Sequence, residues 1–219
     1  MQAGKFAASA LAAICLTACA DPKAASKANF KKALDAYFDQ TRAPACIDLR
    51  SLDAPFPATL PDQRNELGDS LNNAVQILAM ASVGLLTGSP TTIAPRGFTL
   101  DKPTPVAATR YDLSELGKKY YQDRVIGGGL GKMTLHQLCF GTPKVVAIDS
   151  YTEPADSMGY RISKVSYRYT IQGAAQWTQD ASIQKAFPAI AKQLAGEHTE
   201  TDIFVLTSEG WQHQRLSAR

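Results

Sequence analysis

The chain has 219 residues, of which 45% are hydrophobic, 20% charged and 8% aromatic. This composition is typical of a globular protein and excludes a disordered chain, a collagen and a polytopic membrane protein. The 23 basic and 20 acidic residues give a net charge of +3, which is too small to indicate a nucleic-acid partner. We therefore expect one domain, or two small ones, that binds no nucleic acid.

The first 19 residues have the pattern of an export signal. Lys5 supplies a positive charge, and an uncharged, mostly apolar run from Phe6 to Ala18 follows it. This run has the length of a secretory h-region and is shorter than the ~20 residues needed to span a bilayer. It ends in Leu16-Thr17-Ala18-Cys19, which resembles the lipobox of bacterial lipoproteins: a Leu, two small residues and a Cys.

The lipobox resemblance implies an anchored protein. In that family the Cys corresponding to Cys19 carries a diacylglyceryl group, the leader is cut just before it, and the new amino terminus is acylated. Three acyl chains hold a protein on a membrane far more firmly than one. Ala20 stands where an Asp would imply retention in the inner membrane, so we expect the periplasmic face of the outer membrane. The alternatives are a plain signal peptide with an ordinary Cys19, or a buried helix.

Two other cysteines remain for the exported chain, because Cys15 would leave with the leader. Cys46 and Cys139 would then be the only thiols in an oxidising compartment, and we predict that they form a disulfide. The alternative is that Cys139 is a catalytic nucleophile, helped by His136 three residues before it.

Hydrophobic periodicity predicts an α+β fold, with a helical N-terminal part packed on a small strand–strand–helix–strand C-terminal part. Apolar residues recur at helical spacing from Asn29 to Phe38, with Ser26 or Asn29 as the N-cap, and Asp62 would cap a second helix ending near Leu86. We expect a signal peptide at 1–18, a tether at 19–29, the helical part at 30–125, a glycine-rich connector at 126–142 and the α+β part at 143–219.

Alternating apolar residues predict three strands in the C-terminal part, at 144–151, 160–171 and 202–207. The second of these changes parity between Ile162 and Val165, so we expect a β-bulge near Ser163 and Lys164. Residues 177–194 have a helical pattern, in which Pro188 kinks the helix or begins a second one.

Two short sequence segments within residues 84–117 resemble the end of a winged-helix domain. They are Gly84-Leu-Leu-Thr87 and the stretch from Arg110 to Gly117, and a wing-like loop separates them. The helix before the wing reads DNA in members that bind it, using basic and polar side chains. Residues 70–86 contain no Lys or Arg, so the resemblance implies a scaffold and not a DNA reader.

The chain contains no familiar catalytic or metal-binding constellation. The glycine-rich stretch from Ile126 to Met133 fails the phosphate-loop pattern at both ends. His136, His198 and His213 have no metal-ligand spacing. We therefore predict no catalytic residue, no metal and no cofactor. Trp211, beside a glycine turn, is the aromatic residue to test for ligand contact, and the alternative is that it packs in the core.

We expect the protein to act by binding a protein partner of unknown identity, in envelope maintenance or in immunity to an effector. The alternative is a periplasmic cell-wall or ester hydrolase. Its candidate residues would be His136, Ser208 and the acidic group Asp149, Glu153 and Asp156. These residues could act together only if some of them lie within hydrogen-bond reach of one another.

Overall fold

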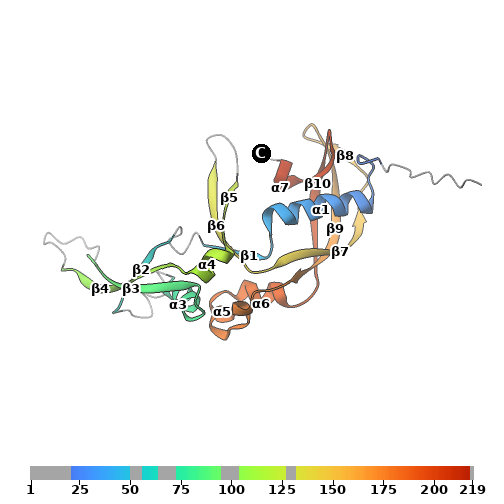
Figure 1. The fold of residues 1–219 in the computed structure, drawn as a ribbon. Helices are drawn as coiled ribbons and strands as arrows, with labels where there is room; N and C mark the ends of the chain where they lie inside the picture. Colours follow the sequence, from blue (N-terminus) through green and yellow to red (C-terminus); the bar gives the residue numbers. More distant parts are fainter. Residues whose placement is uncertain (1–20, 50–55, 64–72, 95–103, 127–131, 218–219) are drawn as a thin grey trace, which may run out of the picture.

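The computed structural model describes residues 21–49, 56–63, 73–94, 104–126 and 132–217. It is mostly β, with 46% strand and 30% helix, and its strands form three sheets (Figure 1). The predicted helical N-terminal part over a small C-terminal part is therefore wrong. No helix in the described ranges is both long enough and apolar enough to span a membrane.

The largest sheet is antiparallel and curls around helix α1 (Figure 1). Its strands follow the order β11-β10-β9-β7, and β8 pairs with the beginning of β9. The strands are β7 (Thr142–Tyr151), β8 (Ala155–Ser157), β9 (Tyr160–Gln172), β10 (His198–Thr207) and β11 (Gly210–His213).

Helix α1 (Lys27–Thr41) fills the concave face of this sheet. Ser26 is its N-cap, and the Ser26 hydroxyl accepts a hydrogen bond from the Asn29 amide at 3.2 Å. The helical stripe predicted from the sequence is buried against strand residues that alternate along β9 and β10. The fully buried aromatic residues of this first core are Phe30, Tyr167, Tyr169 and Phe204.

The segment before α1 is packed against the sheet, although we expected a tether there. The indole Nε1 of Trp211 donates to the Lys23 carbonyl at 3.1 Å, and the Tyr151 hydroxyl donates to the Ala25 carbonyl at 3.1 Å. Gly210 has a φ of +123°, and a Cβ there would lie 2.8 Å from the Pro22 carbonyl oxygen. Only glycine suits that backbone and that close approach.

A second core forms below the first, around two three-stranded sheets and several short helices. One sheet has the order β1-β6-β5 and the other β2-β4-β3. The strands are β1 (Cys46–Asp48), β2 (Ala58–Pro61), β3 (Leu86–Ile93), β4 (Val106–Leu113), β5 (Tyr121–Ile126) and β6 (Met133–Cys139). The helices described after α1 are α3 (Ala74–Ser82), α4 (Glu115–Tyr120), η3 (Gln176–Gln179), α5 (Ala181–Ala186), α6 (Pro188–Leu194) and α7 (Gln214–Ser217).

Prolines explain why the fold class was predicted wrongly. Pro61 lies in β2 and Pro90 in β3, and both strands are at the edges of their sheet. A proline lacks the N–H of a central strand but is tolerated at an edge, so these two proline-containing segments pair as strands. Asp62 directly follows β2. Of the helix expected from Asp62 to Leu86, the described residues show only α3.

The chain on either side of the glycine-rich stretch forms a hairpin. Strands β5 and β6 pair antiparallel, with Ile126 opposite Met133, where we expected a connector between two parts. Residues 84–117 contain the β3–β4 hairpin and the first half of α4. The winged-helix resemblance of this segment stays a prediction.

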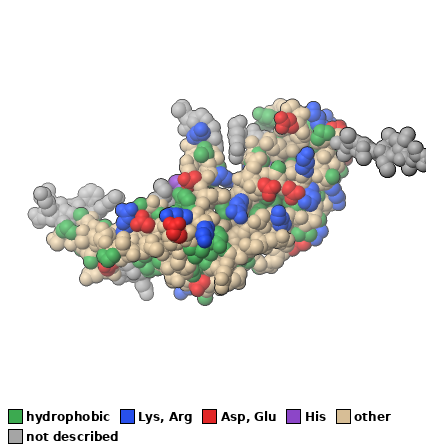
Figure 2. All heavy atoms as spheres, viewed as in Figure 1, with side chains coloured by type: hydrophobic (Ala, Val, Ile, Leu, Met, Phe, Trp, Pro, Cys, Tyr) green, Lys and Arg blue, Asp and Glu red, His purple; other side chains and the backbone are tan. Residues whose placement is uncertain are grey.

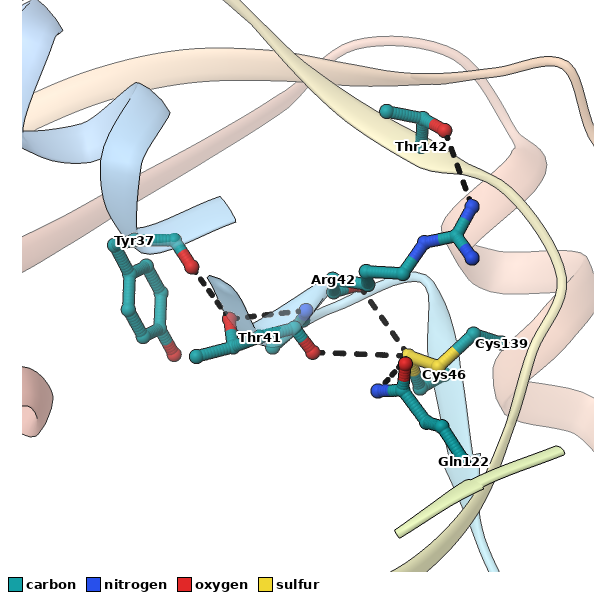
Figure 3. The surroundings of a disulfide bond; sticks show 8 residues. Tyr37, Thr41, Arg42, Cys46, Gln122, Cys139 and Thr142 are labelled. Carbon is teal, nitrogen blue, oxygen red and sulfur yellow. Dashed lines mark hydrogen bonds between the residues drawn. A yellow bond between two sulfur atoms is a disulfide. The ribbon is translucent and has the colours of Figure 1, made fainter. Parts of the chain in front are cut away.

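The predicted disulfide between Cys46 and Cys139 is present. The two cysteines are directly opposite each other in the β1–β6 pair, and 93 residues separate them in sequence. Cys46 follows α1 of the first core, while Cys139 comes just before β7 (Figure 3). The bond therefore joins the two ends of the chain segment that builds much of the second core.

We predict that loss of this bond lowers the free energy of unfolding. Closing a loop of this length removes entropy from the unfolded chain and stabilises by at most about 4–5 kcal/mol. Chemical denaturation of the Cys46→Ser/Cys139→Ser double variant, compared with the oxidised protein, measures the loss. Reductant should move the oxidised protein toward the variant and leave the variant unchanged. Equal midpoints for both proteins would contradict the prediction.

Candidate functional site

A groove lies between α1 and the β10–β11 turn, with a volume of about 390 Å³. We call it the α1–β11 groove. Helix α1 contributes small and polar side chains, while the turn and β11 contribute hydroxyl, amide, carboxylate and indole groups. Its lining residues are Lys32, Ala33, Ala36, Gln40, Thr207, Ser208, Glu209, Gly210, Trp211, Gln212 and Leu216.

Strand β11 gives the groove an edge suited to an extended chain. It is the terminal strand in the order β11-β10-β9-β7, so among the described strands only β10 lies beside it. Three consecutive residues of β11 line the groove, Gly210 to Gln212. An edge strand offers backbone N–H and C=O groups with which another chain can pair. The exposed Ala36 opposite leaves space for such a segment.

Trp211, our candidate for ligand contact, lines this groove. Its side chain is 8% exposed and packs on Phe30 with ring centroids 4.9 Å apart. Its indole N–H is held by the carbonyls of Lys23 and Ala24. The residue therefore forms a fixed wall, and its ligand contact stays a prediction.

Polar side chains also meet on the concave face of the large sheet, beside α1. We call this group the concave-face network: Tyr37, Tyr167, Tyr169, Glu200, Asp202 and His213. Alternation along β9 and β10 puts the strand members on one face, because Glu200 is opposite Tyr167 and Asp202 opposite Val165 in the register. The Tyr169 hydroxyl donates to Glu200 at 2.9 Å.

His213 is the central group of this network, and it is fully buried. Its ring stacks on Tyr37 with centroids 3.8 Å apart. Nδ1 accepts a hydrogen bond from the Arg215 amide at 3.2 Å, so the ring proton of the neutral form is on Nε2, which lies 3.3 Å from the Asp202 carboxylate. Both nitrogens face protein groups, and neither can take a proton from a substrate.

The network changes the acidity of its members. The His213 ring beside the carboxylate, together with a hydrogen bond from the Tyr167 hydroxyl at 2.6 Å, holds the pKa of Asp202 below its ordinary value against the effect of burial. Burial and the neighbouring Asp202 raise the pKa of Tyr167, and burial and Glu200 raise that of Tyr169. These phenols stay protonated and act as hydrogen-bond donors.

The candidate residues of a hydrolase lie in different places. His136 is on β6, and its Nδ1 lies 2.7 Å from the Asp123 carboxylate and 2.8 Å from the Tyr121 hydroxyl. Burial and Asp123 raise the pKa of Tyr121 to about 12. Ser208 borders the groove, and Asp149 pairs with Arg168 at 2.9 Å.

Within the described ranges, no hydrogen bond or ion pair joins any two of the hydrolase candidates: His136, Ser208, Asp149, Glu153 and Asp156. The same ranges hold no cluster of three His, Cys, Asp or Glu residues that could bind a metal. Cys139 is in the disulfide, so it is not a free nucleophile. Cys19 lies outside the described residues.

Sequence reasoning missed most of the groove and the network. Lys32 and Gln40 lie outside the buried stripe of α1, and they line the groove because α1 lies beside the short strand β11. Asp202 and His213 are eleven positions apart and meet only through the β10–β11 pairing, in which His213 is opposite Phe204. The one local signal was the spacing of the two acidic residues in β10, Glu200 and Asp202, which are two positions apart.

Comparisons with known proteins identify no relative. No family model, no curated protein and no solved structure matches the chain. Any assignment of function therefore depends on the residues and geometry described above.

We predict that Asp202 makes stability fall in acid. Its pKa is lower in the folded protein than in the unfolded chain, so protonation below about pH 4 favours unfolding. Asp202→Asn should lose about 1–3 kcal/mol near neutrality, because His213 stays buried without its carboxylate. The same variant should show a shallower loss between about pH 4 and 2.

Urea unfolding midpoints across this pH range measure both effects. Tyr167→Phe is the control, since it keeps the carboxylate and removes one donor, so part of the acid dependence should remain. An Asp202→Asn variant whose midpoint falls with acid as steeply as the unmodified protein would rule out this role for the carboxylate.

Proposed function

We propose that this chain is a lipid-anchored protein of the bacterial cell envelope, on the periplasmic face of the outer membrane, that works by binding a protein partner. The observation that carries the proposal is the Cys46–Cys139 disulfide. Disulfides persist in oxidising compartments and are rare in the cytosol. Together with the lipobox-like Leu16-Thr17-Ala18-Cys19, the bond supports export followed by acylation of Cys19.

The packing of the first described residues supports the same proposal. Cys19 is two residues before Asp21, and a fully extended chain covers about 7 Å over that distance. The segment from Pro22 to Ala25 is held against Gly210, Trp211 and Tyr151. An acyl anchor at Cys19 would therefore hold the fold close to the membrane, with no long tether between them.

Binding accounts for the polar groups better than catalysis does. A general base must reach the proton that it removes, and both nitrogens of the buried His213 already face protein groups. The α1–β11 groove instead offers Lys32, Glu209 and amide side chains beside a strand edge. These groups fit an extended segment of a partner protein, whose backbone would pair with β11.

We predict that Cys19 carries the lipid. In a bacterium that expresses the full chain and is grown with labelled palmitate, the protein should take up label and sediment with membranes. Cys19→Ala should remove both properties, because the acylated thiol is gone. Cys15→Ala is the matched control within the same leader and should change neither. A Cys19→Ala protein that still takes up palmitate and stays with membranes would refute the anchor.

We predict that filling the groove blocks the partner. Ala36→Trp puts a large ring into the groove, while Asp39→Trp puts the same ring on the exposed face of the same helix. After crosslinking in intact cells, a partner captured by the unmodified protein should be recovered equally with Asp39→Trp. Its recovery should fall about tenfold or more with Ala36→Trp, which corresponds to a loss of about 1.4 kcal/mol in binding.

Both tryptophan variants should keep the unmodified thermal midpoint, because both positions are exposed. The groove is excluded as the binding surface if Ala36→Trp captures the same partner in the same amount. A purified protein that hydrolyses peptidoglycan or an ester, and loses this activity with His136→Ala, would replace the binding function with the hydrolase alternative.

A further inference from the structure

The turn between β8 and β9 presents apolar side chains to solvent. Met158 is 96% exposed and Tyr160 is 61% exposed. Met158 and Gly159 are the two residues between the paired ends of the strands, Ser157 and Tyr160. The turn is therefore a narrow tip with a methionine at its end.

The backbone of this tip does not favour methionine. Both turn residues have positive φ, +52° at Met158 and +79° at Gly159. Two-residue hairpin turns with positive φ at both positions strongly prefer Asn, Asp or Gly at the first. Nearly all of the Met158 side chain is exposed, so it contributes little to the core. A disfavoured residue that stabilises nothing inside the fold suggests a contact outside it.

The tip lies at the end of the sheet where the chain leaves toward Cys19. In the β9–β10 register Ile162 is opposite Val205, which brings the start of β9 next to the β10–β11 turn. Pro22 lies against Gly210 at this turn, and Ala25 lies against Tyr151 at the end of β7. Figure 1 shows β8 and the start of the described chain at the same end of the molecule.

Charges near this end are balanced, so a contact there would depend on apolar groups. Figure 2 shows acidic, basic and apolar side chains together over this end. The charges of these segments nearly cancel, because Lys23, Lys27, Lys32, Arg161 and Lys164 are basic and Asp21, Glu153, Asp156 and Glu209 are acidic. Methionine is flexible and apolar, and tyrosine favours the boundary between lipid headgroups and water.

We propose that the β8–β9 turn is a second membrane contact, in which Met158 and Tyr160 enter the lipid–water interface beside the acyl chains on Cys19. The inference rests on the proposed lipid anchor. Two attachments at one end of the sheet fix the tilt of the folded part relative to the membrane, whereas an acyl anchor alone lets the folded part rotate above the membrane surface. The balanced charge implies that the contact forms on zwitterionic lipid as well as on anionic lipid.

The lipidated protein, reconstituted into phosphatidylcholine vesicles, tests this contact. Met158→Cys supplies a free thiol for an environment-sensitive dye, because Cys46 and Cys139 are bridged and Cys19 is acylated. The dye emission should shift to the blue and should be quenched by lipids that carry a nitroxide near the headgroup. Thr92→Cys, labelled at an exposed position of β3 in the other core, is the control, and the nitroxide lipids should not quench its dye.

Failure of the anchor and failure of the contact give different results. If the protein does not float with the vesicles, the proposed anchor is wrong and this inference falls with it. If it floats but the dye at Met158→Cys remains as water-exposed as the dye at Thr92→Cys, the anchor stands and the membrane contact is overturned. A dye that is shielded in intact cells, but not in vesicles, would also overturn it, in favour of a protein partner.

A second variant separates the contact from a role in folding. Met158→Asn creates an Asn-Gly turn, which suits positive φ at both positions, so the thermal midpoint should rise. The same substitution should reduce the quenching of a dye at Tyr160→Cys, because the apolar tip is gone. A lower midpoint, or quenching that stays the same, would contradict the proposal.

Discussion

The covalent bond between Cys46 and Cys139 determines how the two cores can lie relative to each other. The chain passes from α1 of the first core into β1 of the second, and later from β6 of the second core into β7 of the first. The disulfide joins these two crossing points. Arg42 reaches from the end of α1 across this point to the Thr142 hydroxyl at 3.5 Å (Figure 3). Without the bond, α1 and β7 would be joined only through the second core and by packing.

This constraint matters most for α1, because the helix serves two purposes. One side of it fills the curled sheet through residues such as Phe30 and Tyr37, and the other side lines the α1–β11 groove through Lys32 and Ala36. A shift of the helix would change both at once. The stacked Tyr37 and His213 rings, with Asp202 behind them, hold the helix to the β10–β11 hairpin, so the buried network acts as a support for the groove.

Local sequence patterns were sufficient to predict those elements that bury a single face. The stripe on α1, its Ser26 cap and the cysteine pair were predictable, as were the three strands of the C-terminal part. The expected bulge at Ser163 and Lys164 was wrong: β9 pairs there without a break, and the register shifts lie in β7. Ile162 caused the error, because it faces the opposite side, where it pairs with the buried Val205. A change of parity along a strand does not distinguish a β-bulge from a strand that packs on both faces.

The order of the strands and the groove could not be read from the sequence, because they depend on pairings between distant segments. Those pairings bring the β10–β11 turn, the groove and the residues that follow Cys19 to one end of the sheet. If Cys19 carries the anchor, a partner must reach the groove along the surface of the membrane. A partner that is itself membrane-bound is confined to that surface, and its effective concentration at the groove is raised accordingly. The anchor would then supply much of the affinity for the partner, and the groove would supply the specificity.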